Sequence, residues 1–148
     1  FKLSQLVARR MIKQGKDSAR PCVGTIINLS SIAAQRTQSD LMGFSVSCAA
    51  LDQMTRCLAV SLAPERVRVN AVAFGSVMSA SLQDHLREHP DHRDAIIAAT
   101  PQGRIAGPTE VAEAVQFLAS DSSSFVTGEI LTVDGGRSLV DAVNTSLH

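Results

Sequence analysis

The stretch "VRVNAVAF", residues 67–74, most clearly indicates the fold of this chain. It is a short β-branched and apolar run bounded by Gly75, a pattern typical of a strand buried on both faces of a parallel sheet. A second run of this kind, "GTIINLS" at 24–30, precedes it, and helical periodicity between the two extends from about residue 44 to 62. Strand, helix and strand in this order predict parallel strands joined by a crossover helix, and crossovers are expected to be right-handed.

Further elements on either side extend the same pattern. Residues 1–14 carry apolar side chains at helical spacing, and Gly15 is expected to end that helix. The stretch "GPTE" at 107–110 has the features of a helix start, and this helix is predicted to reach about Ser120. "GEILTVDGG", 128–136, predicts a last strand closed by two glycines. Strands that alternate with helices predict an α/β fold with a parallel sheet.

The whole chain, residues 1–148, is predicted to be a single domain. Residues 76–107 form a long variable stretch with one or two short helices, which we interpret as a lid-like segment. The tail 137–148 is expected to be loosely ordered, above all in its last residues. Because three strands are few for such a sheet, the strand at 24–30 should have one edge unpaired unless another segment covers it.

Composition and charge exclude several classes of partner. Fourteen basic and fourteen acidic residues cancel, so nothing in the charge balance favours nucleic acid or an anionic membrane surface. The longest apolar runs are too short to span a membrane, and no signal-peptide pattern is present. The three cysteines, Cys22, Cys48 and Cys57, are odd in number and lack C-x-x-C spacing. They are expected to be reduced thiols in a cytoplasmic protein, not disulfides or zinc ligands.

Four segments, taken together in this order and spacing, carry a family resemblance: "TIINLSS", "FSVSCAALDQMTR", "VRVNAVAFGSV" and "PTEVAEAVQFLASDSSSFVTGEILTVDGG". They resemble the short-chain dehydrogenases/reductases, most of all the 3-oxoacyl-[acyl-carrier-protein] reductase-like branch, over roughly residues 1–137. The resemblance implies a doubly wound Rossmann sheet that binds NAD or NADP. The family's G-x-x-x-G-x-G loop, its Asn-Asn-Ala-Gly segment and its fourth catalytic residue, an asparagine, have no counterpart here. The chain therefore corresponds to the C-terminal portion of the fold.

Three positions match the catalytic residues of the family. Ser31 matches the serine that orients the substrate carbonyl. Thirteen residues later the family tyrosine is replaced by Phe44, and four residues further the family lysine is replaced by Cys48. In the family the tyrosine hydroxyl exchanges a proton with the substrate oxygen, while the lysine lowers the pKa of that tyrosine and holds the nicotinamide ribose. The i, i+4 spacing places both side chains on one face of a helix.

These replacements predict impaired catalysis. Phe44 has no exchangeable proton, and Cys48 is too short to reach the ribose and carries no positive charge at neutral pH. Ser45 and Ser47 flank the pair but point away from it on a helix, and no basic partner for either is evident. Two other interpretations stay open: an ordinary apolar helix with Phe44 and Cys48 as core residues, and an active enzyme with a different proton donor.

The resemblance also suggests cofactor-binding residues after the strand at 67–74. The family has Pro-Gly there, and this chain has Phe74-Gly75; in relatives the next residues approach the nicotinamide. The candidate cofactor-binding residues are Phe74, Gly75, Ser76, Val77 and Ser79. Without a Gly-rich loop we expect this chain not to hold NAD or NADP unaided.

Two further patterns do not predict a site. "HLREH" at 85–89 fits the H-x-x-E-H pattern of zinc peptidases, but Pro90 stops the helix that would carry it and no third ligand follows at a suitable distance. His85, His89 and His92 are interpreted as solvated residues, and no metal site is predicted. "DGG" at 134–136 is interpreted as a turn and not as a phosphate-binding loop.

Assembly is predicted from the same resemblance. The helices at 1–14 and 44–62 match those that family members pack across a subunit interface, and they carry apolar or small residues on more than one face. We therefore expect a homo-oligomer, a dimer or tetramer, or a chain that is stable only beside an N-terminal half. A non-catalytic binding or assembly subunit on the same fold is the alternative to an oxidoreductase.

Overall fold

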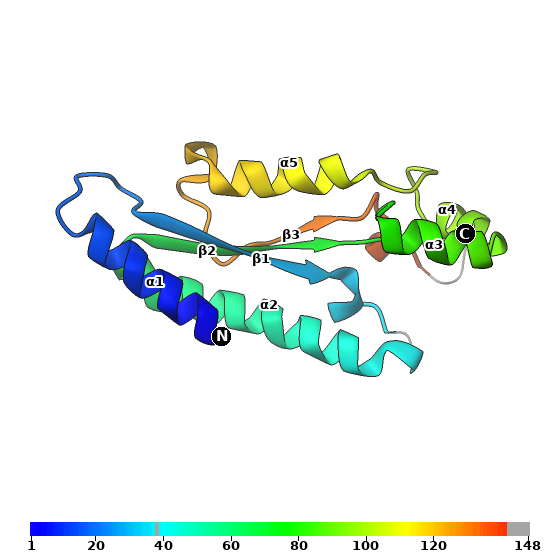
Figure 1. Cartoon of the computed structure of the whole chain (residues 1–148), viewed down its shortest axis with the longest axis horizontal. Helices are drawn as coiled ribbons and strands as arrows, with labels where there is room; N and C mark the ends of the chain where they lie inside the picture. The colour runs from blue at the N-terminus through cyan, green and yellow to red at the C-terminus, as the bar shows by residue number, and fades with distance from the viewer. Residues whose placement is uncertain (38, 142–148) are drawn as a thin grey trace, which may run out of the picture.

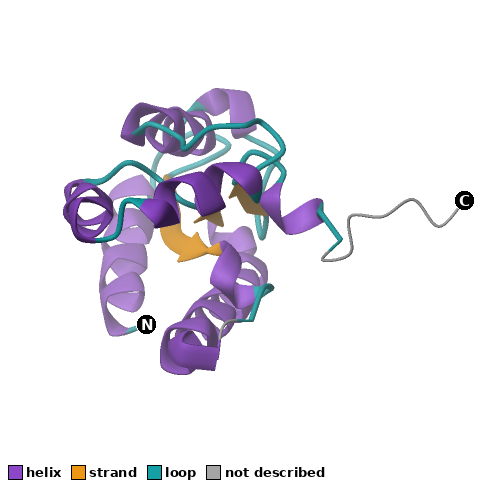
Figure 2. Ribbon diagram, turned by 90° about the vertical axis from the view of Figure 1, so that its right-hand side faces the viewer, coloured by secondary structure: helices purple, strands orange, loops and turns teal. Residues whose placement is uncertain are grey.

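The structure is a computed structural model that describes residues 1–37 and 39–141. Three parallel strands form one sheet in the order β1-β2-β3, and helices cover both of its faces (Figures 1 and 2). This arrangement confirms the predicted α/β fold with a parallel sheet. The strands are β1 Gly24–Ser31, β2 Val67–Phe74 and β3 Ile130–Val133, and the α-helices are α1 Lys2–Gly15, α2 Met42–Leu62, α3 Ala80–Glu88, α4 Asp91–Ala98 and α5 Pro108–Ala119. Short 3-10 helices are η1 Ile32–Ala34, η2 Ser39–Leu41, η3 Ala63–Glu65, η4 Asp121–Ser123 and η5 Arg137–Leu139.

Strand β2 is the centre of the molecule, as its apolar sequence predicts. It pairs with β1 along its full length, and seven of its eight residues are buried. One face of the sheet packs against α1 and α2 through a core that includes Val69, Leu58 and Ala59. On the other face Arg68 and Asn70 donate hydrogen bonds toward α5 and the segment after it. Both β1 and β3 are edge strands, since each has a partner only on the β2 side in the described residues.

The two crossover connections have opposite hands. The strand order is β1-β2-β3 and all three strands are parallel, so both connections step the same way across the sheet. Helix α2 covers one face and α5 the other (Figure 1). The expectation of right-handed crossovers is therefore wrong for one of the two. The connection from β2 to β3 spans residues 75–129 and includes α3 and α4, so it is not the compact strand–helix–strand unit to which the rule applies.

The last strand is shorter than predicted. Ladder pairing with β2 extends over Ile130–Val133 only, within the predicted 128–136. Before it, side chains take part in the pairing. The Thr127 hydroxyl accepts a hydrogen bond from the backbone amide of Val69, and the side-chain oxygen of Asn70 accepts one from the backbone amide of Glu129. After it, the Asp134 carboxylate accepts from the amides of Gly136 and Ser138 and turns the chain. The "DGG" stretch is a turn, as predicted.

Helix ends differ slightly from their predicted positions. Helix α1 includes Gly15, where a Cβ atom would lie 2.3 Å from that of Val23, so the glycine permits close packing there. Helix α2 starts at Met42, two residues before the predicted start, which places Phe44 in its first turn. None of the helices in the described part of the chain is long and apolar enough to cross a membrane.

The segment after β2 contains two short helices, as expected, and the first residues of the tail are more regular than expected. Helices α3 and α4 form an arm beyond the carboxyl ends of the strands (Figure 1). The arm is tied back by the parallel bridge between Val77 and Ala106. The expectation of a loose tail is wrong for its first residues, because Arg137–Leu139 form η5 and the Arg137 guanidinium donates to the Ser76 hydroxyl at 2.7 Å. The rest of the predicted tail, from residue 142, lies outside the described residues.

Candidate active-site cleft

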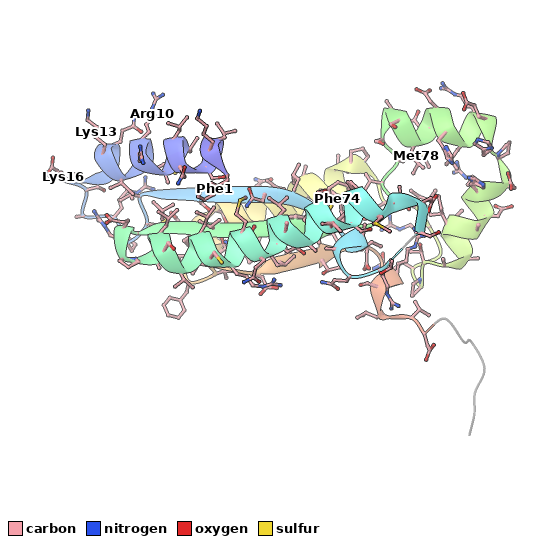
Figure 3. All side chains as sticks on the ribbon, turned by 90° about the horizontal axis from the view of Figure 1, so that it is seen from below. Phe1, Arg10, Lys13, Lys16, Phe74 and Met78 are labelled. Carbon is pink, nitrogen blue, oxygen red and sulfur yellow. The ribbon has the colours of Figure 1, made fainter. Side chains whose placement is uncertain are left out.

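A cleft of about 510 Å³ lies at the carboxyl ends of β1 and β2. Parallel strands place their carboxyl ends at the same edge, and here Ser31 and Phe74 are register partners. Figure 3 places Phe74 between the body of the molecule and the arm that follows Met78. Four predicted site residues line the cleft: Ser31, Phe44, Gly75 and Ser76.

Ser31 is held in a defined position. It is the last residue of β1, and its hydroxyl oxygen accepts a hydrogen bond from the amide of Ala33 at 3.1 Å, which starts η1. An oxygen that accepts from a backbone amide keeps its own proton free to donate. Ser31 is thus suited to hold a polar group of a ligand in the cleft.

Phe44 and Cys48 lie in different environments. The Phe44 side chain lines the cleft, and the residue is 51% exposed. The interpretation of Phe44 as a core residue is therefore wrong, because the first turn of α2 projects beyond the sheet that covers the rest of the helix. Cys48, one turn later, is 6% exposed and does not line the cleft in the described part of the chain. Its interpretation as a small buried side chain agrees with this burial.

The two serines beside Phe44 and Cys48, Ser45 and Ser47, lie outside the cleft. The Ser47 hydroxyl donates to the carbonyl of Phe44 at 2.7 Å, within the same turn of α2. The Ser45 hydroxyl is buried and has no hydrogen-bond partner among the described residues. Neither side chain lines the cleft, as expected from their angular offset on a helix.

The candidate cofactor residues after β2 have structural tasks. A Cβ atom on Gly75 would lie 3.0 Å from the Cβ of Asp134, so the glycine permits the chain to pass the turn after β3. Val77 forms the bridge to Ala106, and the Ser79 hydroxyl caps α3 by accepting from the amide of Leu82. Of the five candidates, only Gly75 and Ser76 line the cleft.

Two arginines that the sequence analysis did not single out, Arg36 and Arg137, line the cleft. The Arg36 guanidinium donates to the carbonyls of Ser138 and Val140, and the Arg137 guanidinium donates to Ser76. Arg36 follows Ser31 by five residues and Arg137 follows the glycine pair, so each lies beside a recognised motif without belonging to it. Both arginines are held by the turn after β3: Arg36 donates to carbonyls that follow this turn, and Arg137 belongs to the segment that leaves it.

Asp134 stabilises that turn. Burial of its carboxylate favours the neutral form, but hydrogen bonds from the hydroxyl and amide of Ser138 and from the amide of Gly136, with the charge of Arg137 nearby, outweigh burial. The pKa of Asp134 is therefore below its ordinary value. The ionised carboxylate helps to hold Arg137 and the tail against the cleft.

A second cavity of about 490 Å³ lies on the other side of Ser76. Arg104 and Glu110 line it and form a bidentate pair with N–O distances of 2.8 and 2.6 Å. The Arg104 guanidinium and the amide of Gly107 lower the pKa of Glu110 to about 2. Glu110 also caps the start of α5 by accepting from that amide, so the pair fixes the end of the variable segment to α5.

The histidines lie on the outside of the arm. Helix α3 ends at Glu88, before Pro90, as predicted. The rings of His85, His89 and His92 lie with centroids 4.8 to 5.1 Å apart, and all three residues are exposed. Within the described ranges, no group of three or more histidine, cysteine or carboxylate side chains is arranged to hold a metal ion.

The sheet, the serine at the end of β1 and the cleft beside it are the features of the site, and the comparisons identify the family. The family described as enoyl-(acyl carrier protein) reductase matches residues 1–138. The chain belongs to the short-chain dehydrogenase/reductase family, and its fold is the Rossmann fold of that family.

Individual relatives agree with this assignment. The chain is 43% identical over 120 residues to cis-4-hydroxycyclohexanecarboxylate dehydrogenase of Sinomonas cyclohexanicum, a match that covers 79% of this chain and 46% of the relative. It is similar to the structure of a gluconate 5-dehydrogenase from Burkholderia cenocepacia J2315 in complex with NADP and tartrate, with a TM-score of 0.82, 28% identity and coverage of 93% of this chain and 51% of the other. It is also similar to a Tyr-to-Phe variant of ElxO with NADPH bound, with a TM-score of 0.80, 28% identity and coverage of 90% and 51%.

The chain spans about half the length of the curated relatives it matches. NAD or NADP is the cofactor of the family. The described residues of this chain do not make a complete site for it, because Gly75 is packed against Asp134, Val77 and Ser79 serve the backbone, and Cys48 is buried at the lysine position. Gly75 and Ser76 can contribute one wall beside the nicotinamide and no more.

Proposed function

We propose that this chain is an oxidoreductase segment that has kept the substrate cleft of its family and lost the proton donor. The observation that carries this proposal is the half-exposed phenyl ring of Phe44 in the cleft that also contains Ser31. A phenyl ring at this place can pack against a ligand but cannot protonate an alkoxide.

The consequence for rate follows from general acid catalysis. A positioned proton donor contributes about 10²–10⁴ to rate, and an alkoxide formed by hydride transfer needs a proton. Cys48 adds a second loss, because a buried thiol gives no cation to lower the pKa of a donor or to hold a ribose. Ser31 can donate a hydrogen bond to the substrate oxygen, but without a second group it cannot replace the proton donor. We expect no ketone–alcohol interconversion near the rates typical of enzymes.

Cofactor binding is part of the proposal. The residues at the end of β2 provide one wall only, so tight binding of NAD or NADP requires a Gly-rich loop from outside residues 1–148. The similar structure of a Tyr-to-Phe variant with NADPH bound supports separating the two losses, since that protein holds the cofactor with a tyrosine replaced. Cofactor binding and turnover should therefore be measured separately.

A non-catalytic binding or assembly subunit is the second candidate. Exposed apolar side chains on α1 and α2 favour it, among them Leu3, Leu6, Val46 and Val60. The open edge of β1 favours it too, because an unpaired apolar edge invites association. In this reading the chain forms a homo-oligomer, a dimer or tetramer, or pairs with an N-terminal half. Three free thiols, Cys22, Cys48 and Cys57, support a cytoplasmic location.

The test is a pair of assays on the full chain. Steady-state oxidation of NADPH or NADH is followed with a panel of ketones and 3-oxoacyl thioesters, and cofactor binding is followed by titration. We expect no turnover, whether or not the cofactor binds. Turnover at about 1–10³ per second would contradict the loss of the proton donor. Absence of both turnover and cofactor binding, together with an oligomer that assembles normally, would favour the assembly subunit.

A further inference from the structure

We propose that the cleft binds a small organic carboxylate with an apolar body, and that Arg36 and Arg137 are its anchors. This inference rests on the proposed function, in which the cleft is kept as a ligand site. It concerns recognition and not turnover.

The walls of the cleft carry more positive than negative charge. Three charged side chains line it, Arg36, Arg137 and Asp141, so its walls carry a net positive charge. Neither guanidinium lies within 4.0 Å of a carboxylate in the described part of the chain. Asp141 has interactions of its own. The charge of Asp134 acts on Arg137, but no carboxylate among the described residues pairs directly with either guanidinium, so both keep donors suited to an anionic ligand.

Each guanidinium is held in position by hydrogen bonds. One terminal nitrogen of Arg36 donates to the carbonyls of Ser138 and Val140, and one terminal nitrogen of Arg137 donates to Ser76 at 2.7 Å. Each guanidinium has five N–H donors, so these bonds fix its position and leave donors over. Arginines held in this way lose little conformational entropy on binding a carboxylate.

The rest of the lining indicates the body of the ligand. Ile32, Leu41, Phe44 and Val140 contribute apolar surface to the same cleft. A volume of about 510 Å³ lies in the range of small-molecule sites, about 300–1,000 Å³. Ser31 adds a hydroxyl that can bind a keto or hydroxyl oxygen. The combination fits an aromatic or alicyclic carboxylate better than a sugar or a bare phosphate.

The test compares benzoate with benzamide, which have the same ring and nearly the same shape but differ in charge. Binding to the full chain is measured by isothermal titration in the absence of any turnover. We expect benzoate to bind at least about tenfold more tightly than benzamide, and Arg137→Gln to remove that preference. Arg10→Gln is the matched control, because Arg10 projects from α1 away from the cleft (Figure 3). It should bind benzoate as the unchanged protein does.

Three outcomes decide the proposal. Equal affinity for benzoate and benzamide would overturn it, as would displacement of benzoate by inorganic phosphate at lower concentration, which would assign the arginines to cofactor phosphates. Arg137→Lys keeps the positive charge but not the planar fork, so its preference for benzoate should be weaker than that of the unchanged protein and stronger than that of Arg137→Gln; a folded Arg137→Lys variant that behaves as Arg137→Gln does would also overturn the proposal. Because the readout is binding, NADPH turnover by the chain would contradict the proposed loss of the proton donor and leave this inference intact.

Discussion

Restoration of the family's tyrosine and lysine is the sharpest test of the proposed loss of the proton donor. We predict that Phe44→Tyr with Cys48→Lys raises the rate of ketone reduction at least about 10²-fold over that of the unchanged chain. This is the lower end of the ~10²–10⁴-fold that a positioned proton donor contributes to rate. The prediction requires that the protein binds NAD or NADP. It uses Ser31, which is already held at the end of β1.

The structure gives the two substitutions different costs. Phe44 is 51% exposed, so a para hydroxyl enters the cleft without crowding and should change stability by no more than about 0.5 kcal/mol. Cys48 is 6% exposed, and a lysine there must extend from a packed position toward the cleft, at about 1–3 kcal/mol. Both costs are smaller than the ~5–15 kcal/mol that stabilises a typical domain, so the double variant should fold.

Asp52 adds a specific complication. It lies one turn after Cys48 on α2, is 4% exposed, and has one carboxylate oxygen without a hydrogen-bond partner among the described residues. An ammonium at position 48 can pair with this carboxylate instead of reaching the cleft. Adding Asp52→Asn should therefore raise the activity of the double variant further.

The assay follows NADPH oxidation with ketones and 3-oxoacyl thioesters, after circular dichroism and cofactor titration show a folded, cofactor-binding protein. Phe44→Tyr with Cys48→Met is the matched control, because methionine extends the side chain without a charge, and it should gain much less activity. A folded double variant that binds cofactor and turns over no faster than the unchanged chain would refute the assignment of Phe44 and Cys48.

Three other predictions concern stability and assembly. Glu110 has a folded pKa of about 2, below its unfolded value, so its contribution is present above the ordinary pKa of glutamate and is lost as pH falls through about 2; Glu110→Gln should lower Tm at pH 7 but not near pH 2, and an equal loss at both would contradict this reading. Leu118 is fully buried, so Leu118→Ala should lower the free energy of unfolding by about 2–5 kcal/mol in denaturant titrations, whereas Leu139→Ala at an exposed site should change it little. Light scattering across a dilution series should show a dimer or tetramer that Val60→Asp weakens, since Val60 is 78% exposed on α2; a well-folded monomer at micromolar concentration, without a second polypeptide, would count against assembly.

Much of the fold could be predicted because its signals are local. The run at 67–74 is continuous and apolar, as a strand buried on both faces requires, and the structure forms β2 over the same residues. The helix start at 107–110 was predicted from proline and glutamate near the amino end, and Glu110 does cap it. The last strand was predicted too long, because Asn70 and Thr127 replace ladder bonds with side-chain bonds, which no local pattern reveals.

The sequence by itself determined the residue types at the catalytic positions, and with them the absence of a phenol at 44 and of an ammonium at 48. Only the tertiary structure decided which of these positions faces the cleft: Phe44 does because the first turn of α2 extends past the sheet (Figure 1), and Cys48 does not because it is buried one turn further along the helix. The same holds for Arg36 and Arg137, which are 101 residues apart in the chain and line one cleft. Their meeting depends on β1 and β3 lying on either side of β2 and on the turn that Asp134 stabilises, and sequence distance carries no information about such contacts.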